Sequence, residues 1–512
     1  MSQHFLFLAL GLGAGATYAL LGVGLVLEYR STAVVNFAHG AMAMWSTFVY
    51  AELRDTGDLL LPVIAIPHRV SLGPDGFSKL AALAISIGFA AALGAVIYLA
   101  IFGRMRESSP LAKLVASVGL MLALQSILVV NLGASATTSR GVAPVLPNEA
   151  VSVFGTSVPQ DRFWVAAIAI VVGLVMWAIY RFTLFGLATR AVSESEDGVA
   201  IIGISSTAVG LTNWMAASML AGIAGILLAP ISRLDVASYT LFVIPALSVA
   251  LLGRLESFGV TVTAGLALGM VQSELTKLQF DHGWLPDTGL QEAVPFVVIM
   301  AALMFSGSKL PVRQDARTTR LANVTRSRFP IAGPLVWGAA GVVGVSLLDG
   351  VWRLGAIQSL TMAVMATSVV ILVGYSGQVS LAQMAFAGVS AFALSILGQD
   401  AGIPFPIVVM LASLCAVPFG LAVGLPSLRA RGIHLAVATL AAAVAIDAFV
   451  FRNASLTGGI SGRTAPEPSI FGLDLGIRGN AATDFPTNEF AIFIVISLTV
   501  TALGVNALRA SR

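Results

Sequence analysis

The chain alternates long apolar runs with short polar or Gly/Pro-rich segments. Nine apolar runs come first, at about 5–27, 33–53, 79–103, 111–133, 163–181, 210–232, 240–254, 257–276 and 291–308. Six more follow, at about 332–349, 354–373, 379–398, 404–425, 433–451 and 489–508. Most approach the roughly 20 residues with which an α-helix crosses a bilayer. The pattern predicts an all-α integral membrane protein, a polytopic bundle of about fifteen spans, of which 240–254 and 257–276 can be re-entrant or tilted.

Composition supports this class and excludes others. Of 512 residues, 57% are hydrophobic and 10% charged, against about 25% charged in soluble domains, and mean hydropathy is +0.92. A water-soluble fold is therefore excluded. The net charge of +3 is spread thinly and forms no nucleic-acid-binding stripe. The single cysteine, Cys415, allows no intramolecular disulfide.

The first apolar run is predicted to be a membrane span. It lacks a basic region before it and extends beyond 20 residues, whereas a cleaved signal peptide has a basic start and a shorter apolar core.

A basic segment separates the two groups of runs and predicts the orientation. Residues 309–329 contain one acid against six basic residues, Lys309, Arg313, Arg317, Arg320, Arg326 and Arg328. The positive-inside rule places this linker (309–331) in the cytoplasm. Seventeen of the 28 basic residues then face the cytoplasm, and the longer loops 54–78, 134–162 and 452–488 face outside. The N-terminus is predicted outside and the C-terminus inside a plasma or inner membrane.

The two groups of runs share a short repeat. VNFAHGA at 35–41 and VSLAQMA at 379–385 match in pattern, and both follow a polar turn containing a tyrosine. We infer two homologous halves, 1–308 and 332–512. Such halves commonly pack about a pseudo-symmetry axis, with broken or re-entrant helices lining a route between them.

The repeat places polar side chains at membrane depth, namely Asn36, His39, Ser380 and Gln383. Their desolvation must be offset by partners or by a wet cavity. One interpretation is a lined pathway or gate. The other is that Asn36 and Ser380 cap short helices, since both residue types are good N-caps; the two are compatible. A metal site at His39 is disfavoured because no second ligand lies at suitable spacing.

Glycines four residues apart occur at Gly11 and Gly15, at Gly265 and Gly269, and at Gly420 and Gly424. Such spacing predicts close helix packing and no substrate contact.

One inner loop is too polar to span the membrane. In the segment 190–204, acids follow a predicted Ser193 cap, and an apolar stretch ends at Gly203. The residues predicted to form this element are Arg190, Ala191, Ser193, Glu194, Glu196, Asp197 and Gly203. A short amphipathic helix here either docks a cytoplasmic partner or lies on its own bundle or the membrane surface.

Several motifs resemble the permease subunits of branched-chain amino acid ABC transporters. RAVSESEDGVAIIGI, AGIAGILLAP and ALLGRLESFGVTVTAG resemble the LivH type. GYSGQVSLAQMAFAGVSAF, RGIHLAVATLA and LTGGISG resemble the LivM type. The resemblance covers nearly the whole chain and implies a fusion of both subunits.

The resemblance implies an importer permease with alternating access. It implies two cytoplasmic ATPase subunits, an extracytoplasmic substrate-binding protein and an amino acid substrate, and it assigns 190–204 as the ATPase-coupling helix. The chain has no GxxxxGK[ST] string, so ATP would be used by the partners and no cofactor is expected here. The sequence stops at NALRASR, where a second coupling loop is expected; truncation, a separate polypeptide or an inactive half would each explain this.

Other functions remain as alternatives. Closely similar permeases serve urea or short amides. An ion-coupled secondary transporter would need an ionisable group at depth, whereas Glu28, Glu274, Asp447 and Arg353 lie near predicted span ends. A membrane enzyme would need a nucleophile, base or metal cluster, and none is evident.

Overall fold

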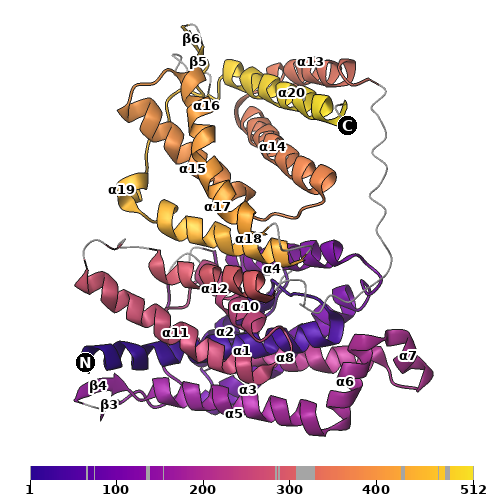
Figure 1. Ribbon diagram of the computed structural model, residues 1–512, viewed down its shortest axis with the longest axis vertical. Coiled ribbons are helices and arrows are strands. Elements are labelled where there is room, and N and C mark those ends of the chain that lie inside the picture. Colours follow the sequence, from indigo (N-terminus) through magenta and orange to yellow (C-terminus); the bar gives the residue numbers. More distant parts are fainter. Residues whose placement is uncertain are drawn as a thin grey trace. The chain divides into compact units, whose positions relative to one another are not determined.

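The computed structural model (Figure 1) divides the chain into two compact units, Met1–Gln314 and Asp315–Arg512. The structure describes residues 2–64, 67–73, 75–133, 139–153, 155–282, 285, 289–306, 329–427, 433–470, 472–478 and 485–510. The six basic residues of the predicted linker lie outside the described residues.

Unit 1 consists of helices and two antiparallel hairpins. The helices are α1 (Ser2–Thr32), α2 (His39–Asp55), α3 (Lys79–Ile97) continued by the π-helical turn η1 (Tyr98–Phe102), α4 (Pro110–Leu132), α5 (Asp161–Phe182), α6 (Leu184–Glu194), α7 (Glu196–Ile201), α8 (Ser206–Leu228), α9 (Val236–Leu241), α10 (Val243–Leu252), α11 (Phe258–Asp281) and α12 (Leu290–Ser306). The hairpins pair β1 (Asp58–Leu60) with β2 (Arg69–Ser71) and β3 (Ala150–Val153) with β4 (Thr156–Pro159).

Serine caps start several of the long helices. The hydroxyls of Ser78, Ser109, Ser205 and Ser257 each accept a hydrogen bond from the backbone N–H three residues later, at the first turns of α3, α4, α8 and α11. Inside a bilayer a helix satisfies its own backbone groups, so an apolar run between a cap and a polar turn folds as a helix.

The structure confirms the helical membrane class. Among the described residues, nine helices are long and apolar enough to cross a membrane, and four shorter apolar helices accompany them. Every predicted run contains a helix.

Several runs are interrupted where the sequence pattern predicts continuity, and two of them lie in unit 1. Residues 33–38 are not helical, so the helix expected from 33 begins at His39. The run 240–254 belongs to two short helices, α9 and α10, that meet at Phe242. Apolar periodicity does not reveal such breaks, because a buried break is as apolar as the helix around it.

Close glycine packing holds α1 against α11, as predicted. A Cβ on Gly11 would lie 2.4 Å from the carbonyl oxygen of Gly269, and one on Gly15 would lie 2.6 Å from that of Gly265. No side chain fits there, so the two backbones approach directly.

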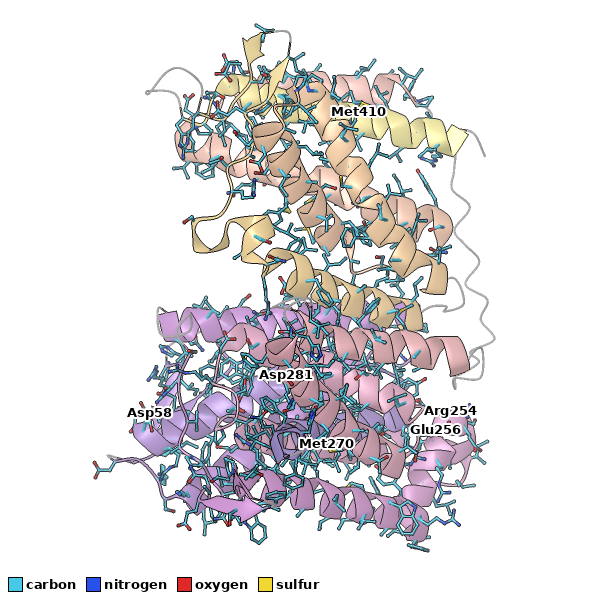
Figure 2. The ribbon with its side chains drawn as sticks, turned by 60° about the vertical axis from the view of Figure 1, so that its left-hand side comes forward. Asp58, Arg254, Glu256, Met270, Asp281 and Met410 are labelled. Carbon is cyan, nitrogen blue, oxygen red and sulfur yellow. The ribbon has the colours of Figure 1, made fainter. Side chains whose placement is uncertain are left out.

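The two ends of unit 1 differ. The N-terminus and hairpin β3–β4 lie at one end, and α6 and α7 at the other (Figure 1). In the same way, Asp58 of the first hairpin lies at the end opposite Arg254 and Glu256 (Figure 2).

Unit 2 contains α13 (Ala332–Ser346), α14 (Gly350–Val369) continued by η4 (Val370–Tyr375), α15 (Gln383–Ser395) continued by η5 (Ile396–Asp400), α16 (Phe405–Cys415), α17 (Val417–Ser427), α18 (Ile433–Ile446) continued by η6 (Asp447–Phe451), α19 (Ala454–Thr457), η7 (Gly459–Ser461) and α20 (Asn488–Ala510). Its hairpin pairs β5 (Ser469–Ile470) with β6 (Leu473–Asp474).

Unit 2 has two small apolar clusters among its described residues. One joins α13, α14 and α20 around Val345, Ile357 and Val495, and the other joins α15 to α18 through Val389 and Ile446. A Cβ on Gly420 or Gly424 would meet no atom within 4 Å. The prediction that this third glycine pair packs two helices together is therefore wrong for the described part of the chain.

Candidate functional site

The break between α1 and α2 places two predicted site residues in the interior of unit 1. Asn36 and His39 are both 0% exposed. The side-chain oxygen of Asn36 accepts a hydrogen bond from the backbone N–H of Ala38 at 2.9 Å, and the carbonyl of Ala38 accepts from Met42 at 2.9 Å. Asn36 thus closes a turn that leads the chain into α2, whose first residue is His39.

The same turn recurs in unit 2. The hydroxyl of Ser380 accepts from the N–H of Ala382 at 3.3 Å, and Gln383 is the first residue of α15. Thr439 of α18 steadies this turn by accepting from the N–H of Leu381 at 3.0 Å. The seven-residue repeat therefore corresponds to a repeated helix–break–helix structure.

The predicted capping role needs correction. Ala38 and Ala382 occupy the N-cap positions, and neither has a side-chain cap. Asn36 and Ser380 bond the N–H two residues ahead, the geometry of an Asx or Ser/Thr turn. The preceding non-helical segment shifts the start of each helix beyond the polar residue.

Glu28 is a member of the site that the sequence pattern did not assign. Its carboxylate oxygen Oε1 lies 3.1 Å from Nδ1 of His39, and both side chains are 0% exposed. A Cβ on Gly24 would lie 2.6 Å from Nε2 of His39, so this glycine makes room for the imidazole. Glu28 and His39 are eleven residues apart and come together only because the chain reverses at 33–38. The sequence signal that could have assigned Glu28 to the site is its position as a charged residue in the last turns of an otherwise apolar span.

The predicted coupling segment forms two helices, α6 and α7. Ser193 lies in the last turns of α6, and its hydroxyl donates to the carbonyl of Arg190 at 2.7 Å. Ser195 is extended, and its hydroxyl accepts from the N–H of Gly198 at 3.0 Å. The prediction of Ser193 as the cap is therefore wrong, because the helix before it continues to Glu194 and the break falls at Ser195.

The end of α7 follows the prediction. Gly203 adopts a left-handed φ of +81°, and its N–H donates to the carbonyl of Ala200 at 3.1 Å. A residue with a Cβ would be strained at this angle.

One face of the segment is anchored and the other is exposed. Val192, Val199 and Val209 form a buried cluster that joins α6, α7 and α8. In contrast, Ile201 is 86% and Ile202 68% exposed.

The other predicted residues of the segment differ in their surroundings, and Ala191 packs against the valine cluster. Arg190 donates to the carbonyl of Tyr180 at 2.8 Å. Glu194 is exposed, Ala191 and Glu196 are half-buried, and the side chain of Asp197 lies outside the described residues.

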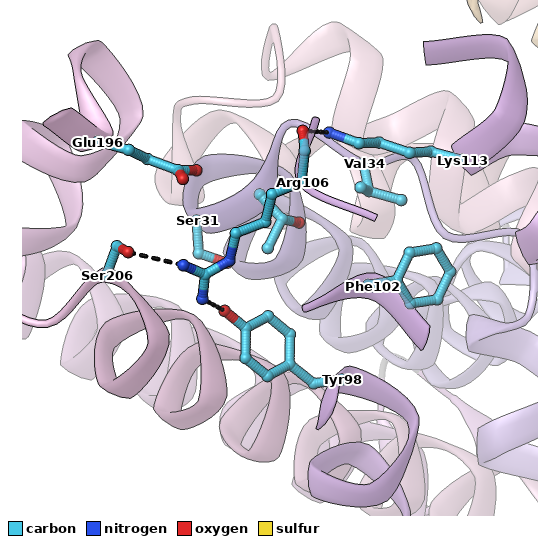
Figure 3. A pocket seen from close by; sticks show the side chains of 9 residues that line it. Ser31, Val34, Tyr98, Phe102, Arg106, Lys113, Glu196 and Ser206 are labelled. Atoms are coloured by element: carbon cyan, nitrogen blue, oxygen red, sulfur yellow. Dashed lines mark hydrogen bonds between the residues drawn. The ribbon is translucent and has the colours of Figure 1, made fainter. Parts of the chain in front are cut away.

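A small polar pocket lies beside α7 (Figure 3). It is lined by Ser31, Thr32, Val34, Tyr98, Phe102, Arg106, Lys113, Glu196 and Ser206. The guanidinium of Arg106 reaches across it and donates to the hydroxyls of Tyr98 and Ser206, each at 2.8 Å. Across this pocket, Arg106 therefore joins the start of α8 to the start of η1.

An ionic cluster ties the opposite end of unit 1 together. Arg140 donates to Glu52 at 2.7 Å and also pairs with Asp55, while Arg69 donates to the second oxygen of Glu52 at 3.1 Å. Burial alone would lower the pKa of Arg140, but its hydrogen bonds to Glu52 and Asp55, together with their negative charges, outweigh burial and raise the pKa. The backbone of Arg140 also exchanges hydrogen bonds with that of Leu234 at 2.9 and 2.8 Å. These contacts hold strand β2, through Arg69, and the loop that contains Arg140 to the C-terminal end of α2.

Within the part of the chain that the structure describes, no three His, Cys, Asp or Glu side chains come close enough to hold a metal ion. The described residues instead show a buried helix break in unit 1, a partly exposed helix break in unit 2, and a short helix, α7, that ends at exposed isoleucines.

Comparison with known proteins identifies the family. The family model described as "Branched-chain amino acid transport system / permease component" matches residues 7–303 and 353–512. The chain belongs to this family. Its multi-pass helical structure agrees with a membrane permease.

Curated relatives match each part of this permease. BraD of Pseudomonas aeruginosa is 26% identical over 272 residues, 51% of this chain and 83% of BraD. LivH of Escherichia coli is 25% identical over 285 residues, 53% of this chain and 87% of LivH. LivM of Escherichia coli is 31% identical over 121 residues, 23% of this chain and 28% of LivM. All three are named high-affinity branched-chain amino acid transport system permease proteins. No solved structure matches the chain.

Proposed function

We propose that this permease forms the membrane path of an ABC importer for branched-chain amino acids, driven by two separate cytoplasmic ATPase subunits. The family and its named relatives support the substrate class. The observation that carries the ATPase coupling is the projecting helix α7, whose isoleucines are exposed while its valine is anchored.

The exposure of Ile201 and Ile202 supports a docking role. Burying an isoleucine side chain contributes about 1.5–3 kcal/mol, so a partner groove that covers both would gain several kcal/mol. Glu194 and Glu196 lie in the same segment and give the surface an acidic margin. The ATPase groove should therefore be apolar with a basic edge.

The two ends of unit 1 support the orientation. The segment 190–204 lies opposite the N-terminus and hairpin β3–β4. With α6 and α7 in the cytoplasm, the N-terminus and both hairpins of unit 1 face outside, where the substrate-binding protein docks. The positive-inside rule, from the sequence alone, likewise puts the basic linker in the cytoplasm.

The helix breaks supply the moving part of the mechanism. ATP-driven closure of the ATPases pushes α7, and the two halves rock to open the path alternately to each side. The non-helical segments 33–38 and 377–382 belong to the gate in this mechanism, with Asn36 and His39 in one half and Ser380 and Gln383 in the other. The chain itself needs no cofactor, since its partners use the ATP.

A docking variant with a matched control tests the proposal. Ile202→Glu places a charge on the α7 surface, whereas Leu473→Glu changes a residue that is equally exposed, at 68%, on hairpin β6. We expect Ile202→Glu to lose the ATPase subunits on purification and Leu473→Glu to retain them. Deletion of 190–204 should also lose them.

Uptake in proteoliposomes completes the test. With the ATPases and the native binding protein present, labelled leucine should accumulate and labelled urea should not. Accumulation of urea instead would assign the short-amide class, and accumulation of any solute without the ATPases would refute the coupled mechanism.

A further inference from the structure

The joint between α7 and α8 is short. α7 ends at Ile201 and α8 begins at Ser206. A force on α7 therefore reaches the first turn of α8 through a few residues. The direction in which that turn moves depends on what holds it.

Arg106 holds this turn to a different part of the bundle. Its guanidinium donates to the hydroxyls of Ser206 at 2.8 Å and Thr207 at 2.9 Å, both in α8, and to that of Tyr98 at 2.8 Å, in η1. The ammonium of Lys113, in α4, donates to the backbone carbonyl of Arg106 at 2.9 Å (Figure 3). Arg106 thus links the starts of α8, α4 and η1 to one another.

The far side of this link is rigid. Tyr98 is 1% exposed, and a Cβ on Gly210 would lie 2.2 Å from its hydroxyl oxygen. The ring of Phe102 stacks on that of Trp214, which is fully buried, at 4.7 Å between centroids. η1 therefore packs closely on α8 through aromatic rings, beyond the hydroxyls that Arg106 binds.

Only arginine has the geometry for this role. Its planar guanidinium carries five N–H donors in a fixed fork, so it can serve three hydroxyls from two helices at once. The single ammonium of a lysine cannot reproduce that arrangement. The π-helical turn is also a form that recurs at functional sites in helices.

We propose that Arg106 is a positioning residue that makes the α7–α8 joint move with η1 and α3 as one body, so that displacement of α7 becomes opening of the path. The role rests on the proposed coupling function. It concerns the transmission of movement after docking and does not concern the docking surface itself.

The test compares Arg106→Ala with Arg104→Ala in proteoliposomes that contain the full chain, its ATPases and its binding protein. Arg104 lies in the same loop and is exposed, and its guanidinium donates to the carbonyl of Leu99. Both variants lose the same charge. The readout is the number of leucine molecules imported per ATP hydrolysed, which is independent of how much protein folds.

We expect Arg106→Ala to retain its ATPases but to import about tenfold fewer molecules per ATP, since a lost hydrogen bond to a charged group weakens a link by about this factor. Arg104→Ala should match the natural protein, and Arg106→Lys should recover only part of the ratio. If Arg106→Ala does not assemble, the double variant Tyr98→Phe/Ser206→Ala takes its place. This variant keeps the guanidinium but removes two of its acceptors, and it should also lower the import ratio.

The outcomes separate the two proposals. An unchanged import ratio in Arg106→Ala, or in the Tyr98→Phe/Ser206→Ala variant where the first does not assemble, would overturn the role of Arg106 alone. If the natural chain does not bind ATPases at all, the proposed function fails and with it this inference.

Discussion

The buried pair between Glu28 and His39 predicts how the break between α1 and α2 is stabilised. The two side chains are 0% exposed and lie 3.1 Å apart. His39→Leu leaves the Glu28 carboxylate buried without this partner. Removing one member of a buried pair costs about 3–5 kcal/mol, whereas replacing both by apolar residues is often close to neutral. We expect His39→Leu to be the most damaging change, Glu28→Leu to be milder, and the double variant to resemble the natural protein.

Hydrogen–deuterium exchange of the purified chain in detergent measures the effect locally. The amides of Ala38 and Met42 report on the turn, since both donate within it at 2.9 Å. A loss of about 3 kcal/mol accelerates exchange through local opening by about 100-fold, because each 1.4 kcal/mol is about a factor of ten. Ala382 and Phe386 hold the equivalent positions in unit 2 and provide the internal control.

The result that would refute this reasoning is specific. If His39→Leu changes exchange at Ala38 and Met42 by less than about threefold, the pair contributes only as much as an average polar contact between membrane helices, about 0.6 kcal/mol. A double variant that exchanges as fast as the sum of the single effects predicts would show that the two residues act independently.

Three further predictions follow from packing, capping and charge. Gly269→Ala should lower the melting temperature of the purified chain, since its Cβ would lie 2.3 Å from the carbonyl oxygen of Gly11 and overpacking costs about 1–3 kcal/mol. The control Gly420→Ala meets no atom within 4 Å and should leave the melting temperature unchanged. Equal melting temperatures of the two variants would contradict this. Ser195→Ala should destabilise α7 by about 1 kcal/mol, which is measured as faster amide exchange at Gly198. Ser193→Ala should leave the exchange of that amide unchanged. Faster exchange in Ser193→Ala than in Ser195→Ala would show that Ser193 is the cap. The raised pKa of Arg140 contributes stability that is fully present below its ordinary pKa and is lost only as pH rises through the folded pKa. Protease resistance of the segment around Arg140 should therefore be constant between about pH 7 and 10 in the natural protein and lower throughout in Arg140→Gln. Loss of resistance within that range would show that another group holds the segment.

Much of the bundle follows from local sequence. An apolar run has no stable alternative to a helix inside a bilayer, so each of the predicted runs contains one. Gly203 ends α7 because only a residue without a Cβ adopts its φ of +81° without strain. The shared pattern at 35–41 and 379–385 likewise predicted a common structure, and both segments form the same turn.

Local errors arose where two residues of the same kind compete. Ser193 and Ser195 are both good caps, and the choice depends on where α6 ends, which its packing through Val192 determines. The helix starts at His39 and Gln383 fall beyond the polar residues for a similar reason. The breaks before them are held by contacts to other helices, such as the bond from Leu381 to Thr439.

The sequence by itself determined the membrane class, the helices and the family, because these depend on residues that are near one another in the chain. Only the tertiary structure decided which polar side chains meet. Glu28 reaches His39 through a chain reversal, and Arg106 bonds Ser206 across 100 residues of sequence. The physical reason is that a buried polar group must find a partner. The packing of helices decides which partner is within reach, and helices that pack together can be any distance apart in the sequence.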